Sequence, residues 1–221
     1  MINKIIDEAL IYHGFTKDFE TDLTSFYVRE SGSAIRFAIL HKLDHLPSPT
    51  ELNTLINQSA PDSFLNHPTF KKNCDLICIH HLNHLAEFKD QEEQIFAIEE
   101  DPHFFKKYVL YYSDTEQHAI QDYTFNELVA TVSDKNQFSN YKEDPLAATH
   151  YSVAAKIFIK LPFLELPFTR RELISLRLQA ADAVAEAGLD ETYTVIQKLT
   201  SNNAEELITE LMSNEMENSA D

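Results

Sequence analysis

The sequence predicts an α+β fold, in which a mixed α/β domain over residues 1–113 precedes an all-helical region over residues 114–221. Two observations lead to this prediction. Short alternating or continuous apolar runs, which are typical of strands, fade after about residue 115. Apolar residues at spacings of three and four, which are typical of amphipathic helices, dominate from there on. The helical region is expected to form a separate domain or to pack on the first domain as one unit.

The amino-terminal elements are predicted to be a helix and a β-hairpin. Residues 3–13 place their apolar side chains on one side and end at Gly14, a residue that favours the end of a helix. Residues 22–29 alternate in polarity, and residues 34–41 are largely apolar. A Ser-Gly-Ser turn separates these two runs, so they are expected to pair as a hairpin.

A second helix and two further strands are expected next. Ser48 opens the sequence Ser-Pro-Thr-Glu, which combines a helix-capping residue with proline at the first helical position. We therefore expect a helix from Ser48 to Ala60. The apolar runs at residues 75–82 and 94–99 are predicted to be buried strands.

The segment that follows these strands is dense in acids and aromatic residues. Asp101 precedes Pro102, a combination typical of a helix start, because aspartate accepts bonds from free N–H groups and proline fits the first turn. We therefore expect Asp101 to cap an aromatic helix that begins at Pro102. We interpret the segment as a rigid docking corner for a partner protein. Its interface candidates are Glu99, Glu100, Asp101, Phe104, Phe105, Lys106, Lys107 and Tyr108.

Helices are predicted through the rest of the chain. They are expected near residues 114–131 and 146–160. Thr169-Arg-Arg-Glu172 has the pattern of a capping box, and the helix that it starts should end at Gly188. Asp190 is expected to cap the helix after that one.

The carboxyl-terminal segment is a second candidate for partner contact. Residues 201–221 contain six acids and no lysine or arginine. Leu207 and Leu211 lie four residues apart in the last expected helix, so they are candidate apolar anchors of an interface. The same leucines would serve equally to pack that helix on the α/β part.

Residues 157–168 form a very apolar segment that two prolines interrupt. Proline prevents this segment from being one regular helix. Two interpretations stay open: a buried connector between the two parts of the chain, or an apolar patch that a partner covers.

Composition and charge limit the classes of partner. The formal charge is −18, so free nucleic acid is not an expected ligand and a basic protein surface is. The three glycines do not form a phosphate-binding loop, so neither ATP hydrolysis nor a cofactor is expected. No apolar run approaches the roughly 18 residues of a membrane span. A cytoplasmic protein with two reduced cysteines is expected.

Metal binding is not expected, although the chain has ten histidines. His80 and His81 would point to opposite faces of a strand, and the chain lacks the pattern His-Glu-x-x-His. Cys74 and Cys78, on one strand, would lie about 13 Å apart, too far for a disulfide. Neither cysteine has a setting typical of a nucleophile, so no catalytic residue is assigned.

A metal-dependent nuclease is the alternative function. A helix, then strands, then acids at strand ends resemble the restriction-endonuclease core, which needs one acid on a strand and an acid-x-Lys motif on the next. Asp75 is the candidate for the first acid. The motif fails after Glu99 and Glu100, because Asp101 and Pro102 stand where lysine is required. A degenerate relative of that core fits the sequence better than an active one.

The block Ile98-Glu-Glu-Asp-Pro-His-Phe-Phe-Lys-Lys-Tyr-Val-Leu-Tyr-Tyr112 resembles the middle component of bacterial ABC-three-component systems, the group that includes Lamassu-type defence. The strand Asp75-Leu-Ile-Cys-Ile79 and the chain length are similar too. The resemblance implies a non-catalytic accessory or adaptor subunit in anti-phage or anti-plasmid defence. Its implied partners are an SMC-like ABC ATPase and an effector subunit, a nuclease or similar protein.

Overall fold

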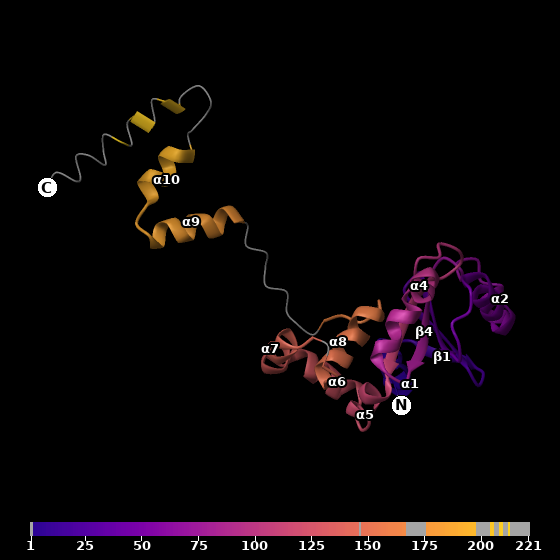
Figure 1. The fold of residues 1–221 in the computed structure, drawn as a ribbon. Coiled ribbons are helices and arrows are strands. Elements are labelled where there is room, and N and C mark those ends of the chain that lie inside the picture. Colours follow the sequence, from indigo (N-terminus) through magenta and orange to yellow (C-terminus); the bar gives the residue numbers. More distant parts are fainter. Residues whose placement is uncertain are drawn as a thin grey trace. The chain divides into compact units, whose positions relative to one another are not determined.

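The computed structural model describes residues 2–145, 147–166 and 176–197, together with residues 204, 205, 208, 209 and 212. The chain divides into two compact units, Met1–Phe168 and Thr169–Asp221 (Figure 1). The first unit contains a five-stranded mixed sheet and helices, which confirms the α+β class. The described part of the second unit contains the helices α9 (Leu176–Glu186) and α10 (Asp190–Gln197).

The sheet has the strand order β1-β2-β3-β4-β5. Its first three strands pair antiparallel, whereas β3, β4 and β5 pair parallel. The parallel strands are joined by helices, as parallel connections require. The strands are β1 (Thr16–Glu20), β2 (Thr24–Ser31), β3 (Ala34–Leu43), β4 (Cys74–Leu82) and β5 (Lys106–Ser113).

Helices precede, connect and follow the strands of the first unit. A short helix, α3, and a 3-10 turn, η1, interrupt the two parallel connections. In chain order the elements are α1 (Ile2–Tyr12), α2 (Pro49–Ser59), α3 (Asp62–Leu65), η1 (Leu85–Glu87), α4 (Phe88–Glu99), α5 (Asp114–Ala119), α6 (Phe125–Ser133), α7 (Lys135–Glu143) and α8 (His150–Lys160).

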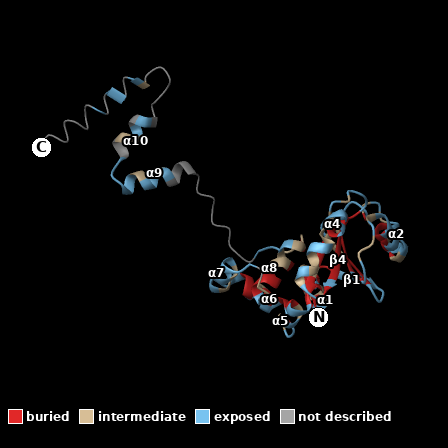
Figure 2. Cartoon of the chain, viewed as in Figure 1, coloured by how far each residue is buried: buried red, intermediate tan, exposed pale blue. Residues whose placement is uncertain are grey.

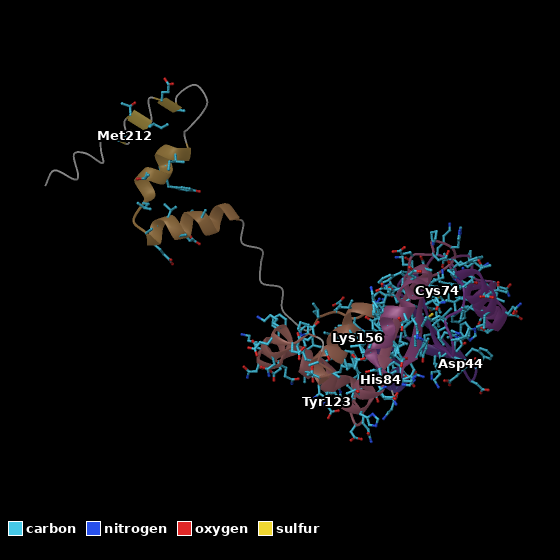
Figure 3. The ribbon with its side chains drawn as sticks, in the orientation of Figure 1. Asp44, Cys74, His84, Tyr123, Lys156 and Met212 are labelled. Atoms are coloured by element: carbon cyan, nitrogen blue, oxygen red, sulfur yellow. The ribbon has the colours of Figure 1, made fainter. Side chains whose placement is uncertain are left out.

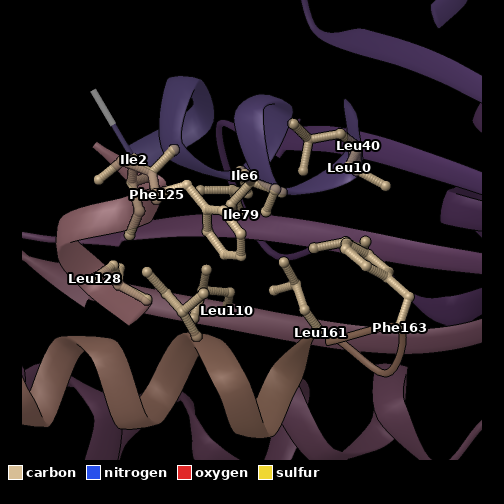
Figure 4. Packing of buried hydrophobic residues seen from close by; sticks show 14 of the residues in the cluster. Ile2, Ile6, Leu10, Leu40, Ile79, Leu110, Phe125, Leu128, Leu161 and Phe163 are labelled. Atoms are coloured by element: carbon tan, nitrogen blue, oxygen red, sulfur yellow. The ribbon is translucent and has the colours of Figure 1, made fainter. Parts of the chain in front are cut away.

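Both faces of the sheet are covered by apolar side chains. Figure 2 shows strand β4 coloured as buried. Strand β4 contributes Ile77 to the cluster that contains residues of α1, α6 and α8, and Leu76 to the cluster that contains residues of α2, α3 and α4. Figure 4 shows the first cluster, including Ile6 of α1 and Phe125 of α6. Because both of its faces are buried, β4 is a nearly continuous apolar run, as central parallel strands usually are.

The amino-terminal predictions are confirmed. Helix α1 ends just before Gly14, which adopts a φ of +79°. The hairpin forms between β2 and β3. Ser48 caps α2 in a complete capping box: its hydroxyl accepts the Glu51 N–H at 3.3 Å, and the Glu51 carboxylate accepts the Ser48 N–H at 2.9 Å. Strand β4 coincides with the apolar run predicted at residues 75–82.

Two predictions around the docking corner are wrong. Residues 94–99 belong to helix α4, in which Ile95 and Ile98 are buried at a helical spacing of three. The helix expected from Pro102 is instead strand β5. Parallel pairing with β4 and a run of aromatic and β-branched residues favour the strand over the helix.

The later helices follow the prediction in part. Helices α5 and α6 lie in or near the predicted range 114–131 and α8 lies within 146–160, whereas α7 and strand β1 were not predicted. Gly188, with a φ of +69°, follows α9. The capping box at residues 169–172 lies outside the described residues.

Helices α6 and α8 share a core with the sheet. Phe125 and Leu128 of α6 and Ile157 of α8 belong to the same buried cluster as Ile77 of β4. One compact unit, Met1–Phe168, therefore contains both the sheet and the helices α5 to α8. Among the described residues, no helix is long and apolar enough to cross a membrane.

The apolar segment at residues 157–168 is divided between core and surface. Leu161 and Phe163 are buried, whereas Ile159 is 73% exposed and Leu166 is 58% exposed. The described part of the segment therefore contributes side chains to the core and also leaves apolar side chains open to solvent. Residues 167 and 168 lie outside the described residues.

Candidate functional site

The docking corner, residues 99–108, connects helix α4 to the edge strand β5. Glu99 is the last residue of α4, and the Glu100 N–H closes the helix by donating to the Phe96 carbonyl at 2.8 Å. The chain then turns through Phe104, which has a φ of +66°. This conformation is uncommon for a bulky residue and costs free energy unless the surrounding structure enforces it.

Asp101 holds the corner together and does not cap a helix, so that prediction is corrected. Its carboxylate lies 2.8 Å from the Lys107 ammonium group, and it accepts hydrogen bonds from Asn53 of α2 at 2.9 Å and from the His103 N–H at 3.3 Å. Burial raises the pKa of Asp101, but these hydrogen bonds outweigh burial and hold the pKa below its usual value. The carboxylate is thus engaged within the fold.

Lys107 is a buried cation. Its side chain has 0% exposed area, and its ammonium group also donates to the carbonyls of His103 at 2.6 Å and Phe105 at 3.2 Å. Buried charges need such complete pairing, because desolvation is costly. Lys107 therefore fixes the path of the chain between α4 and β5.

Glu99 is the second structural acid of the corner. Its carboxylate accepts the Val109 N–H of β5 at 2.8 Å and pairs with Lys160 at the end of α8. One side chain thereby links α4, β5 and α8. Like Asp101, Glu99 is occupied by contacts inside the first unit.

The exposed candidates form a smaller surface. Glu100 and Lys106 are exposed, Tyr108 is half-buried, and Phe104 is 46% exposed. The Phe104 ring lies 4.8 Å from the Lys71 ammonium group. Phe105, by contrast, is buried and packs against Phe70. The other two candidates, Leu207 and Leu211, lie outside the described residues.

Asp75, the candidate nuclease acid, is buried against Arg36. The Nε and Nη2 atoms of Arg36 lie 2.9 and 2.8 Å from one Asp75 carboxylate oxygen. Lys106 is the register partner of Asp75 on the neighbouring strand β5. An acid-x-Lys motif at that lysine requires a carboxylate at position 104, where this chain has Phe104. The geometry thus pairs Asp75 with Arg36, places Lys106 beside it in register, and provides no second carboxylate in that motif.

The histidines of β4 separate as expected for a strand. His80 is buried, and its Nε2 lies 2.7 Å from the Gln91 Oε1 of α4. His81 is exposed, and its Nε2 lies 2.7 Å from the Asp114 carboxylate. Within the described ranges, no group of three or more histidine, cysteine, aspartate or glutamate side chains is arranged to hold a metal ion.

Sequence reasoning missed a basic cleft at the amino ends of the parallel strands. Its volume is about 330 Å³. Arg29, Arg36, Lys72 and Lys106 line it, and Asp75 is the one acid among its lining residues. Each basic residue stands alone in its stretch of sequence or beside one other, so only the strand order gathers them. Arg29, Arg36 and Lys72 lie in or near predicted strands, which was the available signal, whereas Lys106 was expected in a helix.

The family model of the ABC-three component (ABC-3C) system Middle Component 1 matches residues 35–136. The matched segment begins in β3 and includes the docking corner and three of the four basic residues of the cleft. Neither the curated proteins nor the solved structures gave a match to the chain. The part of the chain that carries the parallel strands and the corner is therefore similar to the middle component of an ABC-three-component system.

Proposed function

We propose that this chain is a non-catalytic accessory subunit of a Lamassu-type defence system directed against phage or plasmids. It binds an SMC-like ABC ATPase and helps to hold an effector subunit in the cytoplasm. The observation that carries the proposal is the match of residues 35–136 to Middle Component 1 of ABC-three-component systems. A middle component works beside other components, so binding to partner proteins is the expected role.

The state of the acids supports an accessory role. Asp101 pairs with Lys107, Glu99 pairs with Lys160, and Asp75 pairs with Arg36. Carboxylates that bind a catalytic metal must present open oxygen atoms to the ion. These three carboxylates instead stabilise the connections between elements of the first unit.

Phe104 is the proposed centre of the docking surface. It combines a φ of +66° with a ring that is nearly half exposed. Glycine would adopt this backbone conformation at lower cost, so the aromatic side chain is expected to serve a purpose outside the fold. Aromatic side chains are frequent anchors of protein interfaces. The exposed charges of Glu100 and Lys106 would form part of the rim.

The carboxyl-terminal leucines remain a second proposed contact. Leu207 and Leu211 would provide apolar anchors, and the acids of residues 201–221 would attract a basic partner surface. Double substitution with aspartate should then abolish partner binding and leave the melting temperature nearly unchanged. A large fall in melting temperature would assign these leucines to packing.

Co-purification with the ATPase tests the proposal. Phe104→Ala should reduce recovery of the complex at least tenfold, with the isolated chain still folded. Phe138→Ala is the matched control, because Phe138 is 44% exposed and also has a lysine, Lys142, 4.7 Å from its ring. Equal recovery with both variants would contradict a docking role for Phe104. Failure of the wild-type chain to bind any ATPase encoded beside its gene would overturn the accessory role.

The nuclease alternative has its own test. Purified protein is incubated with DNA and magnesium or manganese, and cleavage is followed on gels. No cleavage is expected. Cleavage that Lys106→Ala abolishes would overturn the accessory proposal in favour of an enzyme, because Lys106 faces Asp75 across β4 and β5.

A further inference from the structure

The basic cleft is a local exception in an acidic chain. The sequence has 36 acidic against 18 basic residues, whereas the cleft has four basic side chains and one carboxylate among its lining residues. Cys74, labelled in Figure 3, forms part of its wall at the start of β4. A cavity of about 330 Å³ falls at the small end of the range for ligand pockets.

The charges of the cleft form a row across four strands. Arg29 of β2 is the register partner of Arg36 of β3, and Asp75 of β4 is the register partner of Lys106 of β5. Like charges directly opposite one another on neighbouring strands are unfavourable. Asp75 offsets the charge of Arg36, but the other cations of the row keep theirs.

Both arginines are held in place by the fold. Arg36 is fixed by its two hydrogen bonds to the buried Asp75 carboxylate. Arg29 donates to the His13 carbonyl at 3.1 Å, and its guanidinium group lies 4.8 Å from the centre of the Phe15 ring. Each guanidinium group retains further N–H donors, since these contacts use only some of them. Donors that are positioned in advance lose little entropy on binding an anion.

The ammonium groups of the two cleft lysines are not paired with any carboxylate of the described residues. Lys72 and Lys106 are exposed, and within the described residues neither has an ion-pair partner. All other elements of the cleft contribute uncharged groups apart from Asp75. The site therefore carries four positive charges against one negative charge.

We infer that this cleft binds a small phosphate compound with two or more negative charges, such as pyrophosphate or the phosphate group of a nucleotide. A phosphate group carries a charge of roughly −1.5 to −2 and several acceptor oxygens, which suits guanidinium forks and ammonium groups together. A single carboxylate would leave most of the positive charge unmatched. The overall charge of −18 repels a long polyanion, so a small ligand fits better than DNA. This inference does not depend on the proposed accessory role.

Calorimetric titration of the full chain with pyrophosphate at low ionic strength tests the inference. Saturable binding is expected, and it should weaken as salt screens the charges. Lys72→Ala and Lys106→Ala should each reduce affinity roughly tenfold. Lys135→Ala is the control, because Lys135 is exposed on α7 and does not line the cleft. Thermal melts establish that all three variants fold.

Three results would overturn the inference. Pyrophosphate does not bind; neither Lys72→Ala nor Lys106→Ala changes its affinity; or Lys135→Ala lowers its affinity as much as the two cleft substitutions do. A competition arm with a short DNA duplex identifies the ligand class. DNA is expected to displace pyrophosphate poorly. A duplex that binds more tightly than pyrophosphate, with the same dependence on Lys72 and Lys106, would replace the small ligand with nucleic acid.

Discussion

The Lys107 ammonium group lies 2.8 Å from the Asp101 carboxylate, with no part of the lysine side chain exposed. The two residues stand on either side of the turn that leads from α4 into β5. Asn53 of α2 donates to the same carboxylate. Asn53 lies in the segment between β3 and β4, and Asp101 lies in the segment between β4 and β5. The buried pair therefore ties these two segments together, and its loss should destabilise the fold more than the loss of a helix cap would.

Replacement of Asp101 should be strongly destabilising. Asp101→Ala leaves the Lys107 ammonium group buried without its counter-ion, so a loss of about 3–5 kcal/mol in the free energy of unfolding is expected. Asp101→Asn should cost less, because the amide oxygen still accepts from Lys107. Urea unfolding measures both. Asp114→Ala, which removes an exposed partner of His81, should cost under about 1 kcal/mol. A loss near 1 kcal/mol for Asp101→Ala would match a helix cap and contradict the buried pair.

His41 should make stability fall in mild acid. Burial lowers the pKa of His41 to about 4, and its Nδ1 lies 2.8 Å from the Thr24 hydroxyl. The unfolded chain binds the proton near pH 6.5, whereas the folded chain resists it until about pH 4. The contribution of His41 to the free energy of unfolding is therefore fully present above about pH 6.5. It is lost as the pH falls toward 4, and the total loss is about 3 kcal/mol.

Unfolding of wild type and His41→Gln at pH 7.5 and pH 4.5 measures this effect. The decrease between the two pH values should be smaller in the variant, because glutamine does not titrate. An equal decrease in both proteins would show that other groups account for the acid sensitivity.

The two cysteines should be unreactive in the native protein. Cys74 and Cys78 are free thiols, and both are buried. Burial raises the pKa of both, that of Cys78 to about 12, so the reactive thiolate is scarce at pH 8. Iodoacetamide should label neither native residue and both in urea, as followed by mass spectrometry. Rapid labelling of the native protein would reveal local opening of β4.

Phe104→Gly should leave the protein as stable as before or stabilise it. Glycine removes the strain of the positive φ, worth about 1–3 kcal/mol, and this outweighs the roughly 0.4–1 kcal/mol lost because glycine makes the unfolded chain more flexible. Thermal unfolding measures the difference. A loss of more than about 1 kcal/mol would mean that the ring and its contact with Lys71 support the fold, which would contradict a docking role for Phe104.

Local signals in the sequence predicted local structure well. The helix α2 could be predicted because Ser48 and Glu51 form a capping box within one turn. Strand β5 could not, because its residues become a strand through parallel pairing with β4, about 30 positions earlier in the chain. The apolar run at residues 94–99 is compatible with a strand or a helix. In the structure it forms a helix, with Ile95 and Ile98 buried on the same side at a spacing of three residues.

The candidate sites likewise combine residues that the sequence indicated with contacts that only the fold creates. Asp101 and Lys107 were both candidates, yet their pairing depends on β5 being a strand, and the hydrogen bond from Asn53 comes from 48 positions away. The basic cleft depends wholly on the order and register of the strands, which place Arg29 beside Arg36 and Lys106 beside Asp75. The spacing of residues along the chain does not indicate such neighbours, because only the folded sheet brings them together.

The carboxylate of Glu99 also limits how another protein can meet the sheet. Strand β5 ends the sheet, and edge strands commonly recruit a strand from a second chain through their free backbone groups. Here the Val109 N–H already donates to Glu99, which Lys160 holds in place. A partner that extended the sheet at Val109 would first have to displace both. Recognition at this edge should therefore proceed through side chains, and the β5 edge should resist pairing with a second copy.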